Sequence, residues 1–210
     1  MELIKWNDNE EYWKLTWLQF KDGDKEAFAT FYNLHVDRLY NYGQTLCNDD
    51  DTVKDAIQEV FLDLYLKRAK NRTTHENLKY YLLLALKRNL IKKLKSKRRF
   101  EGEEISEDKF SELEFSPEYK LIEFENNEEL RLKLSKALDD LPSKQKEAVY
   151  LRFNEGMEYP EIADILGITI ESVRKQVYRA LKTVRKLLDN KSITILFHFF
   201  QRKVKKAVHV

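Results

Sequence analysis

The sequence contains few of the residues that interrupt helices and almost no cysteine. Among 210 residues Cys47 is the only cysteine, which excludes a disulfide within the chain and a cysteine-based zinc site. Five glycines and three prolines provide few turns, and abundant Lys, Glu and Leu favour helices over strands. No apolar run approaches the roughly 18 residues of a membrane span, and residues 1–10 lack a signal-peptide core. We therefore expect an all-α, soluble protein in the reducing cytoplasm.

The formal net charge of +2 conceals blocks of opposite sign along the chain. Residues 1–66 contain 6 basic and 14 acidic side chains, whereas residues 67–99 contain 13 basic and 1 acidic side chain. Residues 100–129 are acidic, with 2 basic and 12 acidic side chains, and residues 172–210 are basic, with 11 and 1. A solvated surface normally mixes both signs, so these blocks favour a polyanionic partner such as nucleic acid. Simple solvation of the charges is the alternative.

The acidic block also indicates how the chain divides into domains. Residues 100–126 lack a sustained helical stripe and contain Gly102, Pro117 and several serines, which is typical of a linker. On both sides of it, apolar residues recur at the helical period. The predicted parts are an N-terminal extension (1–20), a helical domain (21–99), the acidic linker (100–126), a second helical domain (127–189) and a basic tail (190–210).

Three helices are predicted in the first domain. Asp24 is a suitable N-cap for the first helix, a turn at residues 48–51 precedes the second, and the third extends from about Asn77 to Lys97. Apolar residues at spacings of three and four give each helix one buried face. The buried face of the first helix consists of Ala27, Phe28, Phe31, Tyr32, Val36, Leu39 and Tyr40. That of the second consists of Val53, Ile57, Val60, Phe61, Leu64 and Tyr65, and that of the third of Leu83, Leu86, Leu90, Ile91 and Leu94.

The second domain contains the spacing of a helix-turn-helix motif. Ala163 is a small residue suited to a tight helix crossing, Gly167 supplies the turn, and Val173 anchors the second helix on the first. Thr169 is positioned to cap that second helix. An ordinary helical hairpin is the alternative, but the outward face of the second helix contains no acidic residue. That face, which suits a DNA major groove and its phosphates, consists of Arg174, Lys175, Tyr178, Arg179, Lys182, Arg185 and Lys186.

Two segments together resemble a known protein family. They are DAIQEVFLDLY (55–65) and LPSKQKEAVYLRFNEGMEYPEIADILGITIESVRKQVYRALKTVRKLL (141–188), and both are similar to the extracytoplasmic-function (ECF) group of sigma-70 family RNA polymerase sigma factors. The segment GDKEAFATFYNLHVDRLYNY (23–42) resembles the first helix of that family. The resemblance covers about 20–99 and 127–188. It implies a promoter-specificity subunit that directs core polymerase to promoters and melts promoter DNA.

The resemblance also implies where core polymerase binds. In the family the helix with the DxxQEVF motif contacts the β′ subunit, which assigns polymerase binding to Asp55, Gln58, Glu59 and Leu62. A solvated acidic face is the alternative. The acidic linker of the family lies in the RNA exit channel of the polymerase. The implied partners are therefore the β′ and β subunits of the polymerase core, promoter DNA and an anti-sigma factor.

The basic block at 67–99 matches the part of the family that reads and melts the minus-10 promoter element. The residues assigned to this role are Tyr80, Tyr81, Arg88, Asn89 and Lys92. Aromatic rings can stack on an unstacked base, and cations hold the backbone. Leu82–Leu84 depart from the family pattern, in which aromatic or polar residues are common at this place. Tyr80 and Tyr81 are equally compatible with a role in the core.

The helix-turn-helix would read the minus-35 element through its second helix. Arg174, Lys175, Tyr178 and Arg179 share one outward face because their spacing covers little more than one helical turn. Glu171 lies in the first turn, where a carboxylate accepts from cytosine or complements the helix dipole.

Two segments lie outside the resemblance. Residues 1–20 are rich in aromatic side chains and predict an added helix that packs on the first domain. The tail after Leu188 has the pattern of a basic amphipathic helix. It either packs on the protein's own domains or binds a regulatory partner or a membrane surface.

Motifs for catalysis are missing from the sequence. We find no Gly-rich phosphate loop and no HExxH motif, and the four histidines have no ligand spacing. His35 is expected to be a half-buried structural residue. The sequence therefore predicts no enzyme, no cofactor, no metal and no small-molecule substrate. Two alternatives to a sigma factor remain: a helix-turn-helix regulator that binds an operator without polymerase, and a nucleic-acid enzyme whose motif escapes recognition.

Overall fold

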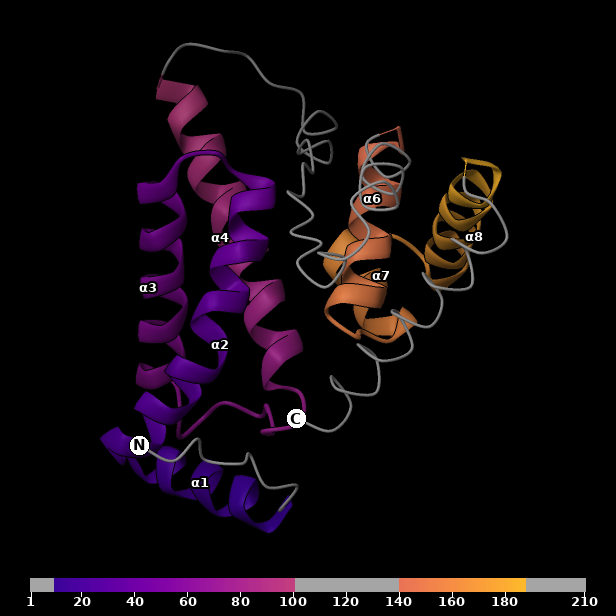
Figure 1. The fold of residues 1–210 in the computed structure, drawn as a ribbon. Helices are drawn as coiled ribbons and strands as arrows, with labels where there is room; N and C mark the ends of the chain where they lie inside the picture. The colour runs from indigo at the N-terminus through magenta and orange to yellow at the C-terminus, as the bar shows by residue number, and fades with distance from the viewer. Residues whose placement is uncertain (1–9, 101–139, 188–210) are drawn as a thin grey trace, which may run out of the picture. The chain divides into compact units, whose positions relative to one another are not determined.

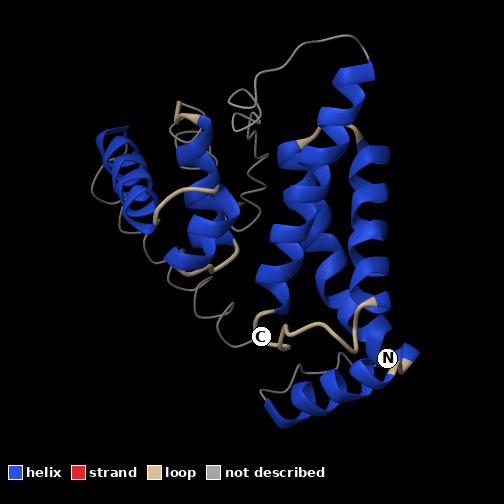
Figure 2. Cartoon of the chain, turned by 180° about the vertical axis from the view of Figure 1, so that it is seen from behind, coloured by secondary structure: helices blue, strands red, loops and turns tan. Residues whose placement is uncertain are grey.

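The computed structural model describes residues 10–100 and 140–187, which fall in two compact units, Met1–Ser111 and Glu112–Val210 (Figure 1). Every regular element in these described residues is a helix (Figure 2). The all-α prediction is therefore confirmed. Among the described residues no helix has the length and apolar character needed to cross a membrane. Most of the acidic linker and the whole basic tail lie outside the described residues.

The described part of the N-terminal extension, residues 10–20, lies in a helix that packs on the first domain, as predicted. This helix, α1 (Glu10–Asp22), lies against α2 (Lys25–Leu46). Trp17 and Phe20 are buried, and the Trp17 ring meets the Phe31 ring edge-on with centroids 5.4 Å apart. The helix extends past residue 20, so that it is continuous with the turn that starts the domain. Aromatic packing of this kind makes α1 part of the core of the first unit.

A glycine turn separates α1 from α2. Gly23 has a φ of 99°, a left-handed conformation that side chains other than glycine rarely adopt. A Cβ at this position would also meet Arg68 Nη2 at 2.9 Å. The predicted cap follows directly, since the Ala27 amide donates to Asp24 Oδ1 at 2.7 Å.

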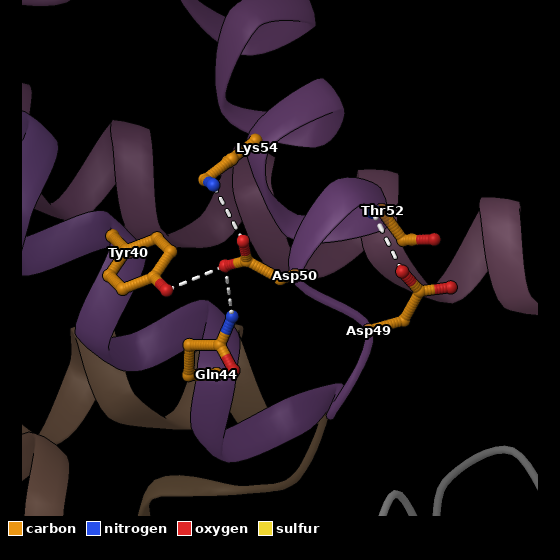
Figure 3. A network of polar contacts seen from close by, with 6 residues as sticks. All are labelled: Tyr40, Gln44, Asp49, Asp50, Thr52 and Lys54. Carbon is orange, nitrogen blue, oxygen red and sulfur yellow. Dashed lines mark hydrogen bonds and ion pairs between the residues drawn. The ribbon is translucent and has the colours of Figure 1, made fainter.

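A polar network fixes the turn between α2 and α3 (Asp50–Leu66) (Figure 3). The Asp50 carboxylate accepts from the Tyr40 hydroxyl at 2.6 Å and from Gln44 Nε2 at 3.0 Å, and it pairs with Lys54 at 2.5 Å. Asp49 caps α3 by accepting from the Thr52 amide at 3.2 Å. The Lys54 ammonium and the Tyr40 hydroxyl hold the pKa of Asp50 below its ordinary value. The network therefore ties the end of α2 to the start of α3.

The fourth helix, α4 (Leu78–Phe100), completes the core of the first unit and packs on α2 and α3. Leu83, Leu86 and Leu90 are buried as predicted, whereas Ile91 and Leu94 are half-buried. Leu78 and Leu82 are also fully buried, which the sequence did not indicate. Leu82 and Leu83 are two of the residues that depart from the family pattern. Both are buried, so the departure supplies apolar side chains to the core of this bundle.

The second unit contains α6 (Ser143–Val149), a π-helical segment η3 (Tyr150–Asn154), α7 (Tyr159–Leu166) and α8 (Ile170–Leu187). The wider turn of η3 is closed by the Glu155 amide, which donates to the Tyr150 carbonyl five residues earlier at 3.1 Å. A capping box starts α7, where the Glu158 amide donates to Glu161 Oε2 at 2.7 Å. Of these elements α6 and α7 pack on α8, which carries the outward face that the sequence singled out, while η3 packs on α6 and α7.

Candidate nucleic-acid interface

The four residues assigned to polymerase binding share one exposed face of α3. Asp55, Gln58, Glu59 and Leu62 are all exposed, while the opposite face of the helix is buried. Leu62 is 57% exposed, and Leu66 one turn further on is 67% exposed. Two exposed leucines thus lie one helical turn apart on a polar, largely acidic face of α3. The sequence did not single out Leu66, although its spacing of four from Leu62 was the available signal.

The residues assigned to the minus-10 element occupy two environments on α4. Arg88 and Lys92 are exposed, whereas Tyr80, Tyr81 and Asn89 are half-buried. The two tyrosines are thus neither core residues nor fully exposed rings. Burial, followed by the nearby Asp63 charge, raises the pKa of Tyr81, so its hydroxyl stays protonated at neutral pH and can donate.

Acidic side chains of α3 pair with basic and amide side chains of α4. Glu59 Oε2 accepts from Asn89 Nδ2 at 2.8 Å, and Glu59 Oε1 accepts from Lys93 Nζ at 2.6 Å. Further along, Lys97 pairs with Asp49 at 3.2 Å. We call the Glu59, Asn89 and Lys93 group the α3–α4 cluster. It joins Glu59 and Asn89, which the resemblance had assigned to two separate surfaces.

Electrostatics favour the ionised carboxylate in this cluster. The Lys93 ammonium and then the Asn89 amide hold the pKa of Glu59 below its ordinary value, against a small opposing effect of burial. Glu59 is therefore an anion at neutral pH. Lys93 was not singled out from the sequence, because its partner lies 34 residues earlier and only the register of α3 on α4 reveals the pairing.

The basic loop between α3 and α4 is held against the α1–α2 turn. The Arg68 guanidinium lies over the Tyr65 ring, 4.5 Å from its centroid, and Arg68 Nη1 donates to the Tyr65 carbonyl at 2.9 Å. Lys21 Nζ donates to the Asn71 carbonyl. Part of the positive charge of residues 67–77 is thereby anchored at the base of the bundle.

The helix-turn-helix has the geometry that its spacing predicted. Ala163 and Val173 are buried, and Gly167 adopts a left-handed φ of 65° at the turn. The Ile168 amide donates to the Ala163 carbonyl at 3.0 Å, which closes the end of α7. The Ser172 amide donates to Thr169 Oγ1 at 3.2 Å, which confirms the predicted cap of α8.

The outward face of α8 is exposed along its length. All seven residues predicted to face outward are exposed: Arg174, Lys175, Tyr178, Arg179, Lys182, Arg185 and Lys186. The inward prediction holds for Val173, Val177, Ala180 and Val184, while Leu181 is half-buried and Leu188 lies outside the described residues. Tyr178, at 67% exposed, presents a large ring to solvent. A cationic helix face with an exposed aromatic side chain suits phosphate and base contacts.

Three of the α8 side chains assigned to the minus-35 element, Glu171, Arg174 and Lys175, have partners within the second unit. Glu171 pairs with Lys175 one turn later at 2.6 Å, so the carboxylate is engaged on its own helix. The Arg174 guanidinium lies 5.6 Å from the centroid of the Tyr159 ring, and Arg152 approaches the same ring at 4.9 Å. Tyr159 thus orients Arg174 from the start of α7. The sequence did not indicate this role for Tyr159.

Metal coordination receives no support from the described part of the chain. No group of three or more His, Cys, Asp or Glu side chains within residues 10–97 and 140–186 is arranged to hold a metal ion. His35 is 7% exposed, more deeply buried than the half-buried state expected from the sequence.

Comparison with known protein families decides between the alternatives left open above. Residues 31–100 match the family described as sigma-70 region 2, and residues 131–184 match the family described as sigma-70, region 4. The chain belongs to the ECF group of the sigma-70 family. The two matches include α3, α4 and the helix-turn-helix.

Curated relatives carry the same family name. The ECF RNA polymerase sigma factor BldN of Streptomyces coelicolor is 29% identical over 170 residues, which are 80% of this chain and 62% of BldN. The RNA polymerase sigma factor SigV of Bacillus subtilis is 27% identical over 176 residues, which are 83% of this chain and 98% of SigV.

A solved structure shares the fold. The sigma factor RpoE of Bartonella quintana, crystallised with the anti-sigma factor NepR, superposes with a TM-score of 0.51. Its sequence is 20% identical, and the match covers 76% of this chain and 95% of that chain.

Proposed function

We propose that this sigma-70 family protein is a promoter-specificity factor that binds core RNA polymerase, recognises promoter DNA and takes part in opening it. The observation that carries the proposal is the pairing, in one chain, of an exposed acidic and apolar face on α3 with an acid-poor cationic face on α8. A regulator that binds an operator alone needs the second face but has no use for the first. The factor is not an enzyme itself, and it acts in the cytoplasm of a bacterium, where the chromosome lies.

The exposed face of α3 is the proposed contact with core polymerase. Leu62 and Leu66 would become buried there, which contributes about 25 cal/mol for each Å² of apolar surface removed from water. Asp55 and Gln58 lie on the same side of the helix and provide polar contacts around the leucines. A small apolar centre with a polar rim is the usual composition of a protein interface.

Promoter DNA is the proposed ligand of α4 and α8. On α4, Tyr80 and Tyr81 would stack on unpaired bases, and Arg88, Asn89 and Lys92 would contact bases and backbone of the minus-10 element. On α8, Arg174, Lys175, Tyr178 and Arg179 would enter the major groove of the minus-35 element. Glu171 is already paired with Lys175 and would hold that lysine in position. Its negative charge in the first turn would also interact favourably with the dipole of α8.

An anti-sigma factor is a further proposed partner. RpoE of Bartonella quintana was crystallised with such a protein, and the α3 face described above offers an apolar surface that a competitor of polymerase would cover.

Transcription from genomic DNA tests the proposal. The purified chain is added to bacterial core polymerase and fragmented genomic DNA of the organism that encodes it, and the 5′ ends of new transcripts are sequenced. We expect start sites that require the chain and share two upstream sequence elements. A double variant with Gln58→Ala and Leu62→Ala is the matched control and should give few such transcripts. Operator-like binding without any new start sites would favour the polymerase-independent regulator.

A further inference from the structure

The α3–α4 cluster lies where the proposed polymerase helix meets the proposed promoter-reading helix. Both oxygens of the Glu59 carboxylate accept from α4, at 2.8 Å from Asn89 Nδ2 and at 2.6 Å from Lys93 Nζ. The Glu59 side chain is 55% exposed and the Lys93 side chain 27% exposed. Glu59 therefore sits at the edge of the α3 face, with its charge turned toward α4.

The chemistry of a carboxylate fixes the orientation of the Asn89 amide. An ionised carboxylate only accepts hydrogen bonds, so the NH₂ end of the amide must face Glu59. The bond between them lies at an exposed position, whereas Asn89 Oδ1 is buried and has no hydrogen-bond partner. The two ends of an asparagine amide have nearly the same shape, so without such a partner either orientation would fit the site. In this chain Glu59 removes that freedom.

We propose that Glu59 is a positioning residue that sets the hydrogen-bonding polarity of Asn89 for promoter reading. With Oδ1 turned inward, Asn89 offers DNA only the second hydrogen of its amide nitrogen. The Glu59 carboxylate is also approached by the ammonium groups of half-buried Lys93, which donates to it, and of exposed Lys92, whose charge acts on it. We call Asn89, Lys92 and Lys93 the donor edge of α4. The inference rests on the proposed function and assigns Glu59 to promoter reading in place of polymerase contact.

A donor edge favours bases that present acceptors. Guanine presents O6 and N7, and thymine presents O4, whereas the exocyclic amino groups of adenine and cytosine are donors. An amide free to turn over would accept from those amino groups as readily as it donates. The chemical class that this site selects is therefore an unstacked guanine or thymine that turns its acceptor edge, O6 and N7 or O4, toward α4 at one position of the minus-10 element.

A structural role alone would not account for the arrangement. Exposed ion pairs contribute little to stability, and Asp49 with Lys97 makes a comparable α3–α4 pair at 3.2 Å without involving an amide. The Glu59 group differs because it also orients a side chain that can read a base. The Glu59 group is expected to affect base preference, and the Asp49–Lys97 pair is not. The second pair can therefore serve as a control for the first.

The test compares Glu59→Gln with Asp49→Asn in the full-length chain with core polymerase. Glutamine keeps the size of Glu59 but carries both a donor and an acceptor, so it no longer dictates the orientation of Asn89. The templates are the most used promoter from the genomic transcription experiment and its single-base variants across the minus-10 element. We expect Glu59→Gln to reduce discrimination about tenfold at one position, with core affinity within twofold of wild type. Asp49→Asn keeps an N-cap residue and should leave discrimination unchanged.

A double-mutant cycle identifies the residue through which Glu59 acts. In an Asn89→Ala background, Glu59→Gln should change base discrimination no further. An additive effect in that background would overturn the inference. So would a loss of core affinity with unchanged base preference, since that result would return Glu59 to the polymerase interface.

The free chain provides a readout that does not depend on transcription. The side-chain NH₂ signals of Asn89 in an NMR spectrum should shift and broaden in Glu59→Gln but not in Asp49→Asn. If wild type directs no transcript, the proposed function fails and the promoter role of Glu59 fails with it, whatever the spectra show. If wild type is active but the NH₂ signals are insensitive to Glu59→Gln, the positioning role is wrong while the proposed function stands.

Discussion

The two proposed DNA-reading helices hold their charged side chains in different ways. On α4, Asn89, Lys93 and Lys97 are engaged by Glu59 of the neighbouring helix α3 and by Asp49, the N-cap of that helix. On α8, Lys175 pairs with Glu171 of the same helix, and the rest of the outward face stays exposed. The geometry of α4 therefore depends on ion pairs and a hydrogen bond from α3, whereas the reading face of α8 takes a ring contact from α7, between the Arg174 guanidinium and Tyr159. A partner that binds α3 can influence α4 through these polar contacts, whereas the contact that reaches the reading face of α8 comes from Tyr159 of α7.

The largest expected effect breaks the second unit and leaves the first intact. Val173 is completely buried between α7 and α8. Val173→Asp places an unpaired carboxylate in that core, which should cost several kcal/mol and unfold the helix-turn-helix. Hydrogen exchange read by mass spectrometry should show lost protection in residues 140–187 and unchanged protection in residues 10–97. Tyr178→Asp, on the exposed face of the same helix, is the control; unfolding of both units by Val173→Asp would contradict the separation drawn above.

The next effect sharpens the account of α8 by separating base reading from phosphate contact. Arg174→Ala or Arg179→Ala should cost about 1–3 kcal/mol and relax preference at one or two minus-35 positions, because a guanidinium reads guanine with two hydrogen bonds. Lys182→Ala should weaken binding equally for all sequences and reduce its salt dependence. Holoenzyme binding to promoter variants at several salt concentrations measures both. If each of the three variants weakened binding to all promoter sequences by the same factor, the base-reading residues would lie elsewhere on α8.

A comparable effect is expected on the polymerase side of α3. Gln58→Ala should weaken core binding by about 1–3 kcal/mol through lost interface contacts, and Leu62→Ala by a similar amount through lost apolar burial. Competition for core polymerase against a labelled wild-type chain measures the affinity. Both residues lie off the buried face of α3, so thermal unfolding should stay close to wild type. Unchanged affinity in both variants would remove this face from the interface.

The smallest effect, for a change of one pH unit, concerns the pH dependence of the stability of the first unit. Burial, then the charges of Arg38 and Lys79, lower the pKa of His35 from 6.5 to about 3. His35 is thus neutral when folded, while the unfolded chain takes up its proton below pH 6.5. Stability should fall between pH 6.5 and 3 by at most about 1.4 kcal/mol per pH unit from this residue. Urea unfolding of His35→Leu should lack this part of the slope; an unchanged slope would show that other groups cause it.

The helices and their buried faces could be predicted because each depends on residues close together in the sequence. Asp24, Gly167 and Thr169 act within one turn of their position, and the structure finds them in the predicted caps and turn. The capping box of α7 was not predicted, because Glu158 is not one of the Ser, Thr, Asp or Asn residues that mark an N-cap in sequence. Nor was the π-helical segment, because no local residue type specifies an extra residue in a turn.

The side-chain partners of the proposed site residues could not be predicted. Glu59 and Asn89 are 30 residues apart, and their contact depends on the register between two helices. Arg174 meets Tyr159 for the same reason. Leu78 and Leu82 belong to the core through the way α4 crosses α2 and α3, which periodicity within α4 did not specify uniquely.

Footprinting of promoter DNA with and without core polymerase tests the central claim most directly. The DNA is a promoter found by the genomic transcription experiment, probed at physiological salt with the free chain, with core alone and with both. We expect protection of the minus-35 and minus-10 elements only when both are present, because one α8 makes few base contacts and extruding a base costs a few kcal/mol. Tight, sequence-specific protection by the free chain, unchanged by core polymerase, would contradict the account and identify a regulator that acts alone.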